Sequence, residues 1–237
     1  MPYKEMARFA PPPMESTPAD ATALDPGRVG RLTHGMTKLR TVCVFCGSSA
    51  GVRPEHLSDA ETLGRLLAEA GLGLVYGGGN IGLMGAVARA ALAAGGHVTG
   101  IIPRFLVERE VMLADVQELI VTDDMHERKR LMFERSDAFV ALPGGIGTLE
   151  ELVEELTWAQ LGRHAKPILI ADLHGFWTPL ITLFDHMFAE GFLRPGLEAP
   201  YIAVSDVSEI LPALEHALPM IEEIAEEAEP VAPVGQL

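Results

Sequence analysis

The alternation of short apolar runs with helical patterns of ten or more residues constrains the fold of this chain most. Strands that alternate with helices of that length form βαβ units and therefore a parallel sheet. We expect a single α/β, Rossmann-like, doubly wound parallel sheet of about seven strands, with helices on both faces. Strands are predicted at 41–46, 72–76, 97–102, 118–122, 138–142, 167–171 and 201–204, and helices at 55–70, 82–94, 125–135, 148–161, 176–189 and 206–219.

The chain of 237 residues has room for one large α/β domain and does not require two. We expect this nucleotide-binding catalytic domain at 39–219. Residues 1–38 are rich in Pro, Ala, Thr and charge without apolar periodicity, which predicts a disordered N-terminal tail. Residues 220–237 are acidic and end in Pro, Gly and Gln, which predicts a second disordered tail.

The charge balance and the termini restrict the partners. A formal net charge of −15 disfavours non-specific binding to nucleic acid. No run approaches the roughly 18 to 20 apolar residues of a membrane span. Pro11–Pro13 and Asp20 fall where a signal peptide would have its apolar core. We therefore expect a cytoplasmic protein that binds neither nucleic acid nor membrane.

Cysteine and histidine placement favours neither redox nor metal chemistry. Cys43 and Cys46 are spaced C-x-x-C, but they lie inside a predicted strand and not at a helix N-terminus. We interpret them as buried structural thiols in a reducing compartment. The eight histidines are scattered without a metal-ligand spacing, so we expect no catalytic metal.

Three glycine loops follow strands at the edge where a parallel sheet binds ligands. They are 47–51, 77–82 and the Pro-Gly-Gly-Ile-Gly-Thr segment at 143–148. The last one ends a buried strand and begins a helix, so free backbone N–H groups and the positive end of a helix dipole meet there. That arrangement is suited to a phosphate group. The loops together favour a nucleotide-type ligand.

The loop at 77–82 also matches the dinucleotide fingerprint G-x-G-x-x-G. It follows the second strand instead of the first, and Ile102-Pro103-Arg104 stands where an acidic residue should bind a ribose hydroxyl. Glycines needed for tight helix–sheet packing explain the loop equally. An NAD-dependent oxidoreductase is therefore a weak alternative.

Two charged segments are candidates for chemistry, and each also has a structural interpretation. The basic segment 125–132 contains Arg128 and Lys129, and it could be a solvated helix that offsets surplus acid. Glu151 follows the third glycine loop, and Thr148 with Glu151 fits a capping box. The capping box explains the glutamate but not the Pro-Gly-Gly turn before it.

These motifs together resemble the LONELY GUY (LOG) family of cytokinin riboside 5′-monophosphate phosphoribohydrolases. The resemblance covers about 40–205 and rests on Gly47-Ser-Ser49, Tyr76-Gly-Gly-Gly79 with Gly82-Leu-Met-Gly85, Met125-His-x-Arg-Lys129 and Pro143-Gly-Gly-x-Gly-Thr-x-x-Glu151. It implies a homodimer or higher homo-oligomer that hydrolyses the N-glycosidic bond of an adenosine 5′-monophosphate, with or without an N6 substituent. The products would be the free base, a cytokinin or adenine, and ribose 5-phosphate.

The resemblance also implies roles for individual residues. Arg128 and Glu151 fall on the family's catalytic pair, and no cofactor or metal is implied. A carboxylate near the ribose suits this reaction because positive charge develops on the sugar as the bond breaks. Substrate-binding positions fall on Gly47, Ser48, Gly78, Gly79, Met84, Glu110, Lys129, Gly144, Gly145, Ile146, Gly147, Thr148, Leu149, Glu150 and Thr157.

Three points stay open at the level of the sequence. Molybdenum-cofactor carriers belong to the same superfamily, so a non-catalytic nucleotide or cofactor carrier is the alternative function. Some family members carry the label lysine decarboxylase, but we find no site for pyridoxal phosphate. Neither the preferred base nor the biological role, hormone activation or nucleotide salvage, follows from the residues.

Overall fold

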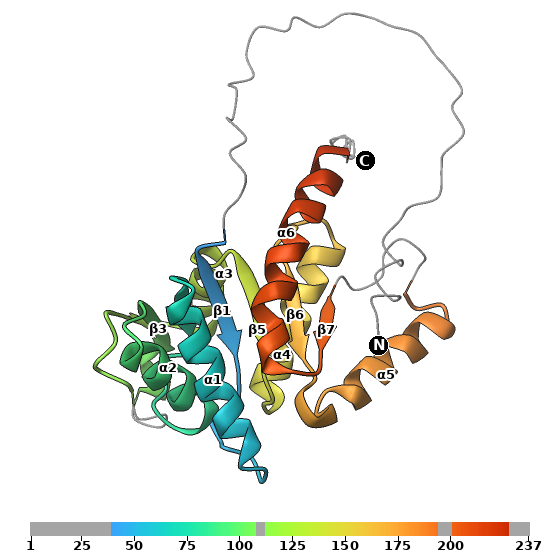
Figure 1. Ribbon diagram of the computed structural model, residues 1–237. Coiled ribbons are helices and arrows are strands. Elements are labelled where there is room, and N and C mark those ends of the chain that lie inside the picture. The colour runs from blue at the N-terminus through green and yellow to red at the C-terminus, as the bar shows by residue number, and fades with distance from the viewer. Residues whose placement is uncertain (1–38, 108–111, 194–200, 228–237) are drawn as a thin grey trace, which may run out of the picture.

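The computed structural model describes residues 39–107, 112–193 and 201–227 and confirms the α/β fold (Figure 1). The strands are β1 (Thr41–Phe45), β2 (Gly73–Tyr76), β3 (Val98–Pro103), β4 (Glu118–Thr122), β5 (Ala138–Ala141), β6 (Ile168–Ala171) and β7 (Ile202–Val204). The α-helices are α1 (Glu55–Glu69), α2 (Gly82–Ala93), α3 (Met125–Glu134), α4 (Ile146–Gln160), α5 (Thr178–Ala189) and α6 (Ile210–Glu227).

The strands form one seven-stranded sheet in the order β4-β3-β2-β1-β5-β6-β7. Every strand pair is parallel. The chain moves outward from β1 to β4, then returns to place β5 on the other side of β1. The switch point therefore lies between β1 and β5, and the crevice at their carboxyl ends is where such a sheet binds ligands.

Helices cover both faces of the sheet. One apolar core joins α1, α2 and α6 to the sheet through residues such as Leu63, Val87 and Leu214. The other joins α3 and α4 to the opposite face through Met132 and Leu152. Because strands buried on both faces must be apolar throughout, β1, β5 and β6 are almost continuously buried.

Most helix boundaries differ from the prediction by a few residues at most, and two differences affect the site and the C-terminal tail. Helix α4 begins at Ile146 and not at residue 148, because Gly145 with its extended backbone serves as the N-cap. Helix α6 runs to Glu227, so the tail expected from residue 220 begins inside a helix. Apolar residues continue at helical spacing past 219, at Met220, Ile221 and Ile224, which favours this extension. Residues 1–38 and 228–237 lie outside the described ranges, and the division into a domain and two tails stays a prediction.

Both cysteines are buried thiols outside any disulfide, as the sequence predicts. Burial, followed by the negative charges of Glu151 and Glu155, raises the pKa of the Cys43 thiol well above its ordinary value. A thiol in that state is neutral and unreactive, which suits a structural role.

Within the described ranges, no helix combines the length and the apolar character that crossing a bilayer requires.

Candidate active site

The glycine loops after β1, β2 and β5 meet at the switch point. Gly47, which lies two residues beyond β1, donates its backbone N–H to the carbonyl of Pro143 at 3.0 Å. The carbonyl of Gly47 accepts the N–H groups of Leu83 at 3.0 Å and Met84 at 3.3 Å, in the first turn of α2. The start of α2 is therefore closed by the neighbouring loop.

The start of α4 is open. Its N-cap is Gly145, and no side chain accepts a hydrogen bond from the first turn. Ile146 is 81% exposed, so this turn faces solvent. Gly144 packs so closely on Thr148 that a Cβ at 144 would collide with the threonine hydroxyl. The first N–H groups of a helix have no partner within the helix, so this turn offers backbone donors to an anion.

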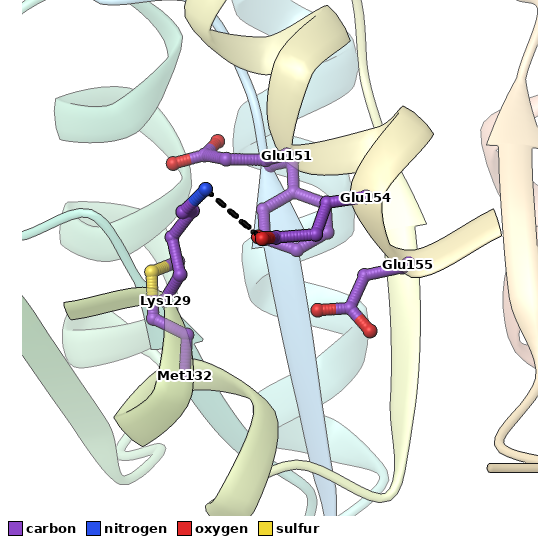
Figure 2. Close-up of a pocket in the computed structure, with 6 residues that line it drawn as sticks. Lys129, Met132, Glu151, Glu154 and Glu155 are labelled. Carbon is purple, nitrogen blue, oxygen red and sulfur yellow. Dashed lines mark hydrogen bonds and ion pairs between the residues drawn. The ribbon is translucent and has the colours of Figure 1, made fainter. Parts of the chain in front are cut away.

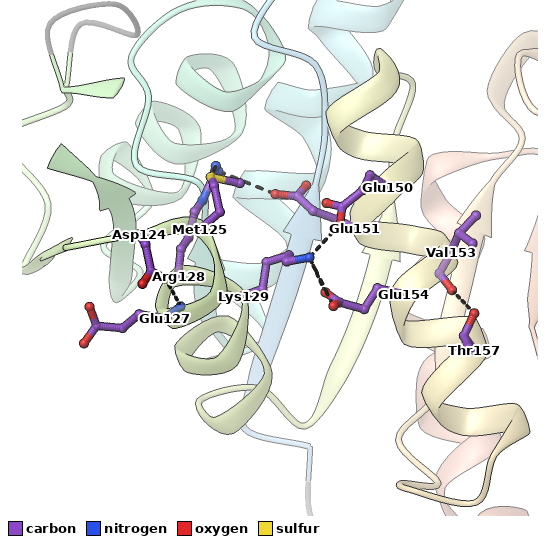
Figure 3. A network of polar contacts seen from close by, with 10 residues as sticks. All are labelled: Asp124, Met125, Glu127, Arg128, Lys129, Glu150, Glu151, Val153, Glu154 and Thr157. Carbon is purple, nitrogen blue, oxygen red and sulfur yellow. Dashed lines mark hydrogen bonds and ion pairs between the residues drawn. The ribbon is translucent and has the colours of Figure 1, made fainter. Parts of the chain in front are cut away.

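A buried ion pair lies close to this helix end (Figure 3). Nη2 of Arg128 is 3.6 Å from Oε1 of Glu151, and the two side chains are 7% and 11% exposed. Nε of Arg128 is buried without a hydrogen-bond partner among the described residues. Gly77 admits the guanidinium, since a Cβ there would collide with Nη2 of Arg128 and contact Sδ of Met84 at 3.0 Å.

The two alternatives that the sequence left for these charges are wrong. Arg128 is 6% exposed and not part of a solvated surface. Thr148 is the third residue of α4 and not its N-cap, so Glu151 cannot close a capping box with it. Buried charges are unfavourable unless they are paired, so the placement of this pair at the ligand-binding crevice of the sheet favours a functional role.

Lys129 connects α3 to α4 through two glutamates. Its Nζ lies 2.6 Å from Glu150 and 3.0 Å from Glu154. Burial alone would lower the pKa of Lys129, but the hydrogen bonds and charges of the two glutamates outweigh burial and raise it. Lys129 is therefore charged throughout the neutral range, and it holds α4 at a fixed position relative to α3.

A narrow gap between α3 and α4 carries these groups (Figure 2). It encloses about 170 Å³ including open solvent, which is less than the roughly 300 Å³ that small-molecule pockets occupy at minimum. Glu155 lies deeper, 3% exposed, with Oε2 at 3.4 Å from Nε2 of His164. The side chains fill this gap, so a ligand has to lie over the open glycine loops beside it. Its lining residues are Phe45, Lys129, Met132, Glu151, Glu154 and Glu155.

Not every predicted substrate-binding residue is brought to this place. Thr157 lies on α4 beyond Glu154, and its exposed hydroxyl donates to the carbonyl of Val153 at 2.7 Å (Figure 3). Ser48 is exposed at the edge of the first loop. Glu110 lies outside the described residues. Gly78 has a positive φ of 79° and packs on Ile102, which identifies it as a packing glycine.

Two contributors were missed by the sequence reading. Gly77 shapes the space for Arg128, and Glu154 completes the binding of Lys129. The spacing of Glu154 and Glu155 from Glu150 and Glu151 by four residues was a visible signal, because residues four apart share a helix face.

A possible metal-binding group lies elsewhere in the described part of the chain. One ligand atom each from His56, Asp59 and His174 lie within 4.8 Å of one another. These residues belong to α1 and to the turn after β6, on the sheet face opposite α3 and α4.

Comparisons with known proteins place the chain among relatives. The family model described as "Possible lysine decarboxylase" matches residues 84–214. The cytokinin riboside 5′-monophosphate phosphoribohydrolase LOG7 of Arabidopsis thaliana is 43% identical over 188 residues, covering 79% of this chain and 87% of the relative. LOG5 of the same plant is 46% identical over 185 residues, covering 78% and 81%. The rice protein named probable phosphoribohydrolase LOGL1 is 42% identical over 210 residues, covering 89% and 90%.

Among solved structures, the molybdenum cofactor carrier protein of Chlamydomonas reinhardtii superposes with a TM-score of 0.60 at 24% identity, covering 77% of this chain and 99% of the carrier. The molybdenum cofactor binding protein of Rippkaea orientalis gives a TM-score of 0.55 at 24% identity, covering 76% and 98%. At this identity the likeness is one of fold alone.

Proposed function

Because the chain belongs to the LOG family of phosphoribohydrolases, we propose that it hydrolyses the N-glycosidic bond of adenosine 5′-monophosphates, with or without an N6 substituent. The observation that carries the proposal is the buried Arg128–Glu151 pair beside the open first turn of α4. Relatives at 42–46% identity bear the corresponding name.

The 5′-phosphate binds at the start of α4. Residues 144–148 supply backbone N–H groups there, and the exposed first turn leaves room for the ligand. The negative overall charge of the protein makes backbone donors the suitable choice, since no basic surface is needed. Fixing the phosphate places the ribose next to Glu151, five residues after Ile146, so much of the rate enhancement comes from positioning.

Glu151 then acts at the sugar. As the bond between C1′ and the purine nitrogen breaks, positive charge develops on the ribose, and the carboxylate stabilises it. Glu151 also accepts a proton from the attacking water, whose oxygen bonds to C1′. The departing base takes up a proton from solvent at its nitrogen, and Glu151 returns the proton it accepted to solvent, which leaves free base and ribose 5-phosphate. Arg128 holds the carboxylate and contributes donors toward the phosphate or ribose.

The base lies toward the methionines next to this centre. The Sδ atom of Met84 lies beside Gly77, at 3.0 Å from where a Cβ of that residue would be. Met132 lines the gap between α3 and α4. Flexible thioether side chains adapt to bases of different size. Adenine and an N6-prenylated adenine therefore both remain substrates to test.

Lysine decarboxylation has no support in the described residues. A pyridoxal enzyme needs a lysine free to form a Schiff base. Lys129 is held by two glutamates, and Nζ of Lys166 donates to the carbonyl of Phe133 at 2.6 Å. The carrier alternative rests on fold alone, and a carrier of anions has no use for a carboxylate at the ligand.

The activity test is incubation with AMP and with isopentenyl-AMP, followed by chromatography for the free base. We expect free base from a 5′-monophosphate and none from adenosine, because the phosphate provides the positioning. Comparable turnover of adenosine and AMP would contradict the proposal, and so would binding of both nucleotides without release of base.

We also propose a homodimer or higher homo-oligomer in the cytoplasm. Helix α5 contains no buried residue and extends from the body of the protein (Figure 1). Leu183 and Phe188 on it are 45% and 44% exposed, and Phe192 just beyond it is 83% exposed. Apolar surface of this kind is characteristic of protein–protein contacts. Light scattering coupled to gel filtration should give at least twice the mass of one chain, and a monomer would refute the assembly.

A further inference from the structure

A group of two histidines and one aspartate lies apart from the hydrolytic site. His56 and Asp59 stand in the first turns of α1, and His174 lies in the 3₁₀ turn Leu173–Gly175 after β6. Nε2 of His174 is 2.9 Å from Oδ2 of Asp59, although 115 residues separate them in the sequence. The fold thus brings together two segments whose proximity no local sequence pattern indicates.

The geometry is close to that of a metal site. One ligand atom from each residue lies within 4.8 Å of the other two. In a tetrahedral zinc site with bonds of about 2.05 Å, two ligand atoms are about 3.3 Å apart. The distance of 2.9 Å between Nε2 of His174 and Oδ2 of Asp59 is close to that value. Small side-chain rotations would therefore bring all three ligand atoms around one ion.

A second observation concerns His56. Its ring is only 6% exposed, and its Nδ1 is buried without a hydrogen-bond partner among the described residues. An unpaired buried polar group is unfavourable and requires a compensating interaction. Coordination next to Asp59 and His174 would supply one.

The backbone at His174 presents its ring to α1. Its φ of 56° is in the left-handed region, and His174 is the sole non-glycine residue of the described chain with a positive φ. Such a conformation persists where surrounding contacts stabilise it. Two contacts stabilise His174 here. One is its hydrogen bond with Asp59, and the other is the ring of His56, whose centroid is 5.8 Å from that of His174.

We propose that His56, Asp59 and His174 bind a divalent transition-metal ion, with Zn²⁺ as the best match. Two imidazole nitrogens and one carboxylate oxygen are zinc ligands, whereas Mg²⁺ prefers oxygen alone. Water completes the fourth position. The ion joins the start of α1 to the turn after β6 and so stabilises the edge of the sheet next to the loop 47–51. Because α1 packs on the sheet face opposite α3 and α4, which carry Arg128 and Glu151, we expect the ion to stabilise the fold and not to contact the reacting bond.

The test measures metal-dependent stability of the full chain after dialysis against a chelator. We expect added Zn²⁺ to raise the unfolding temperature by several degrees, and added Mg²⁺ at the same concentration to leave it unchanged. Asp59→Asn and His174→Gly should each weaken Zn²⁺ binding in calorimetry by about tenfold or more. Glycine suits the positive φ at 174, so that variant folds without strain.

His97→Ala is the matched control, because His97 is exposed between α2 and β3 and far from the group in the fold. It should retain the full response to Zn²⁺. Substituting Co²⁺ separates the site from Cys43 and Cys46, since thiolate ligands would give an intense charge-transfer band and the proposed ligands would not.

Three results would overturn the proposal: no stabilisation by Zn²⁺, an equal response in the Asp59→Asn and His174→Gly variants, or a cobalt–thiolate band. The release of base from AMP is a separate measurement, and we expect it to survive chelation. Loss of zinc binding with intact hydrolysis, or the reverse, would therefore show which of the two proposals fails.

Discussion

Helices α2 and α4 both begin after a glycine loop at the same edge of the sheet, yet their first turns differ. The first turn of α2 donates to the carbonyl of Gly47, so its backbone donors are used within the protein. The first two residues of α4, Ile146 and Gly147, are exposed, and no neighbouring loop of the described chain closes this helix start as Gly47 closes that of α2. A glycine motif alone therefore does not mark a phosphate site. What decides is whether another segment already accepts the N–H groups of the helix start.

The buried faces of the two helices differ in the same way. The sixth residue of α2 is Val87, in the apolar core, and the sixth residue of α4 is Glu151, opposite Arg128. Helix α2 packs so tightly that a Cβ on Gly64 of α1 would collide with the carbonyl of Val87. Helix α2 thus serves packing, whereas α4 combines open donors with a buried carboxylate, and the predictions below test that contrast.

The largest effect is expected for Glu151→Gln. Glutamine retains the shape but removes the negative charge that stabilises the ribose, so turnover of AMP should fall on the order of 10²-fold or more. Nucleotide binding and the unfolding temperature should change little. Glu134→Gln is the control, because Glu134 is exposed at the end of α3 and pairs with Arg130. Nearly full turnover in Glu151→Gln would make Glu151 a structural residue, as Val87 is in α2.

The next effect is expected for Arg128→Lys. The charge remains, but the planar guanidinium that fits against Gly77 and faces Glu151 is lost. Hydrogen bonds to charged groups contribute about 1.5–3 kcal/mol, so kcat/KM should fall about 10- to 100-fold. Steady-state kinetics beside Arg130→Lys, an exposed position on the same helix, gives the comparison. Equal kinetics in both variants would contradict the assigned role.

Two glycine substitutions test the closed and open helix starts directly. Gly82→Ala places a Cβ against the backbone of Ser48 at a φ of 60°, so the free energy of unfolding should fall by about 2–5 kcal/mol in urea denaturation.

Gly147→Ala tests the open start of α4. The added methyl group meets no atom within 4 Å and improves helix propensity, so the free energy of unfolding should rise or stay equal. Its methyl group lies where we place the phosphate, so KM for AMP should rise about tenfold. An unstable Gly147→Ala protein or an unaffected KM would contradict the open start.

The smallest effect concerns α3, whose first turn is capped by its own side chain. The Asp124 carboxylate accepts the N–H of Glu127 at 2.9 Å, and this bond is the main cause that lowers the pKa of Asp124. Asp124→Ala should lower the unfolding temperature by about 2–5 °C. Asp124→Asn should keep most of the stabilisation, because asparagine also caps helices. A carboxyl group with a depressed pKa stabilises above its unfolded pKa of about 3.9. The difference between wild type and Asp124→Ala should therefore be present above about pH 4 and vanish as the pH falls through the folded pKa. A difference independent of pH would argue against a charged cap.

Much of the fold could be predicted because the signals are local. Apolar runs such as 138–142 and helical periodicity such as 55–70 fix element type from neighbouring residues alone. The boundaries of α4 and α6 could not be predicted as well. Whether Gly145 or Thr148 begins α4 depends on how the loop packs against Gly47, which lies nearly a hundred residues earlier.

From the residues alone, the order of the elements, the parallel sheet, the family, and Arg128, Glu151 and the loop 143–148 as candidate site groups could be predicted. Only the tertiary structure decided which glycine loop stays open, that Arg128 faces Glu151, and that His174 reaches His56 and Asp59. The reason is physical. Periodicity records the environment of each residue along one element, whereas the pairing of buried charges and the partners of backbone N–H groups depend on distances between segments far apart in the chain.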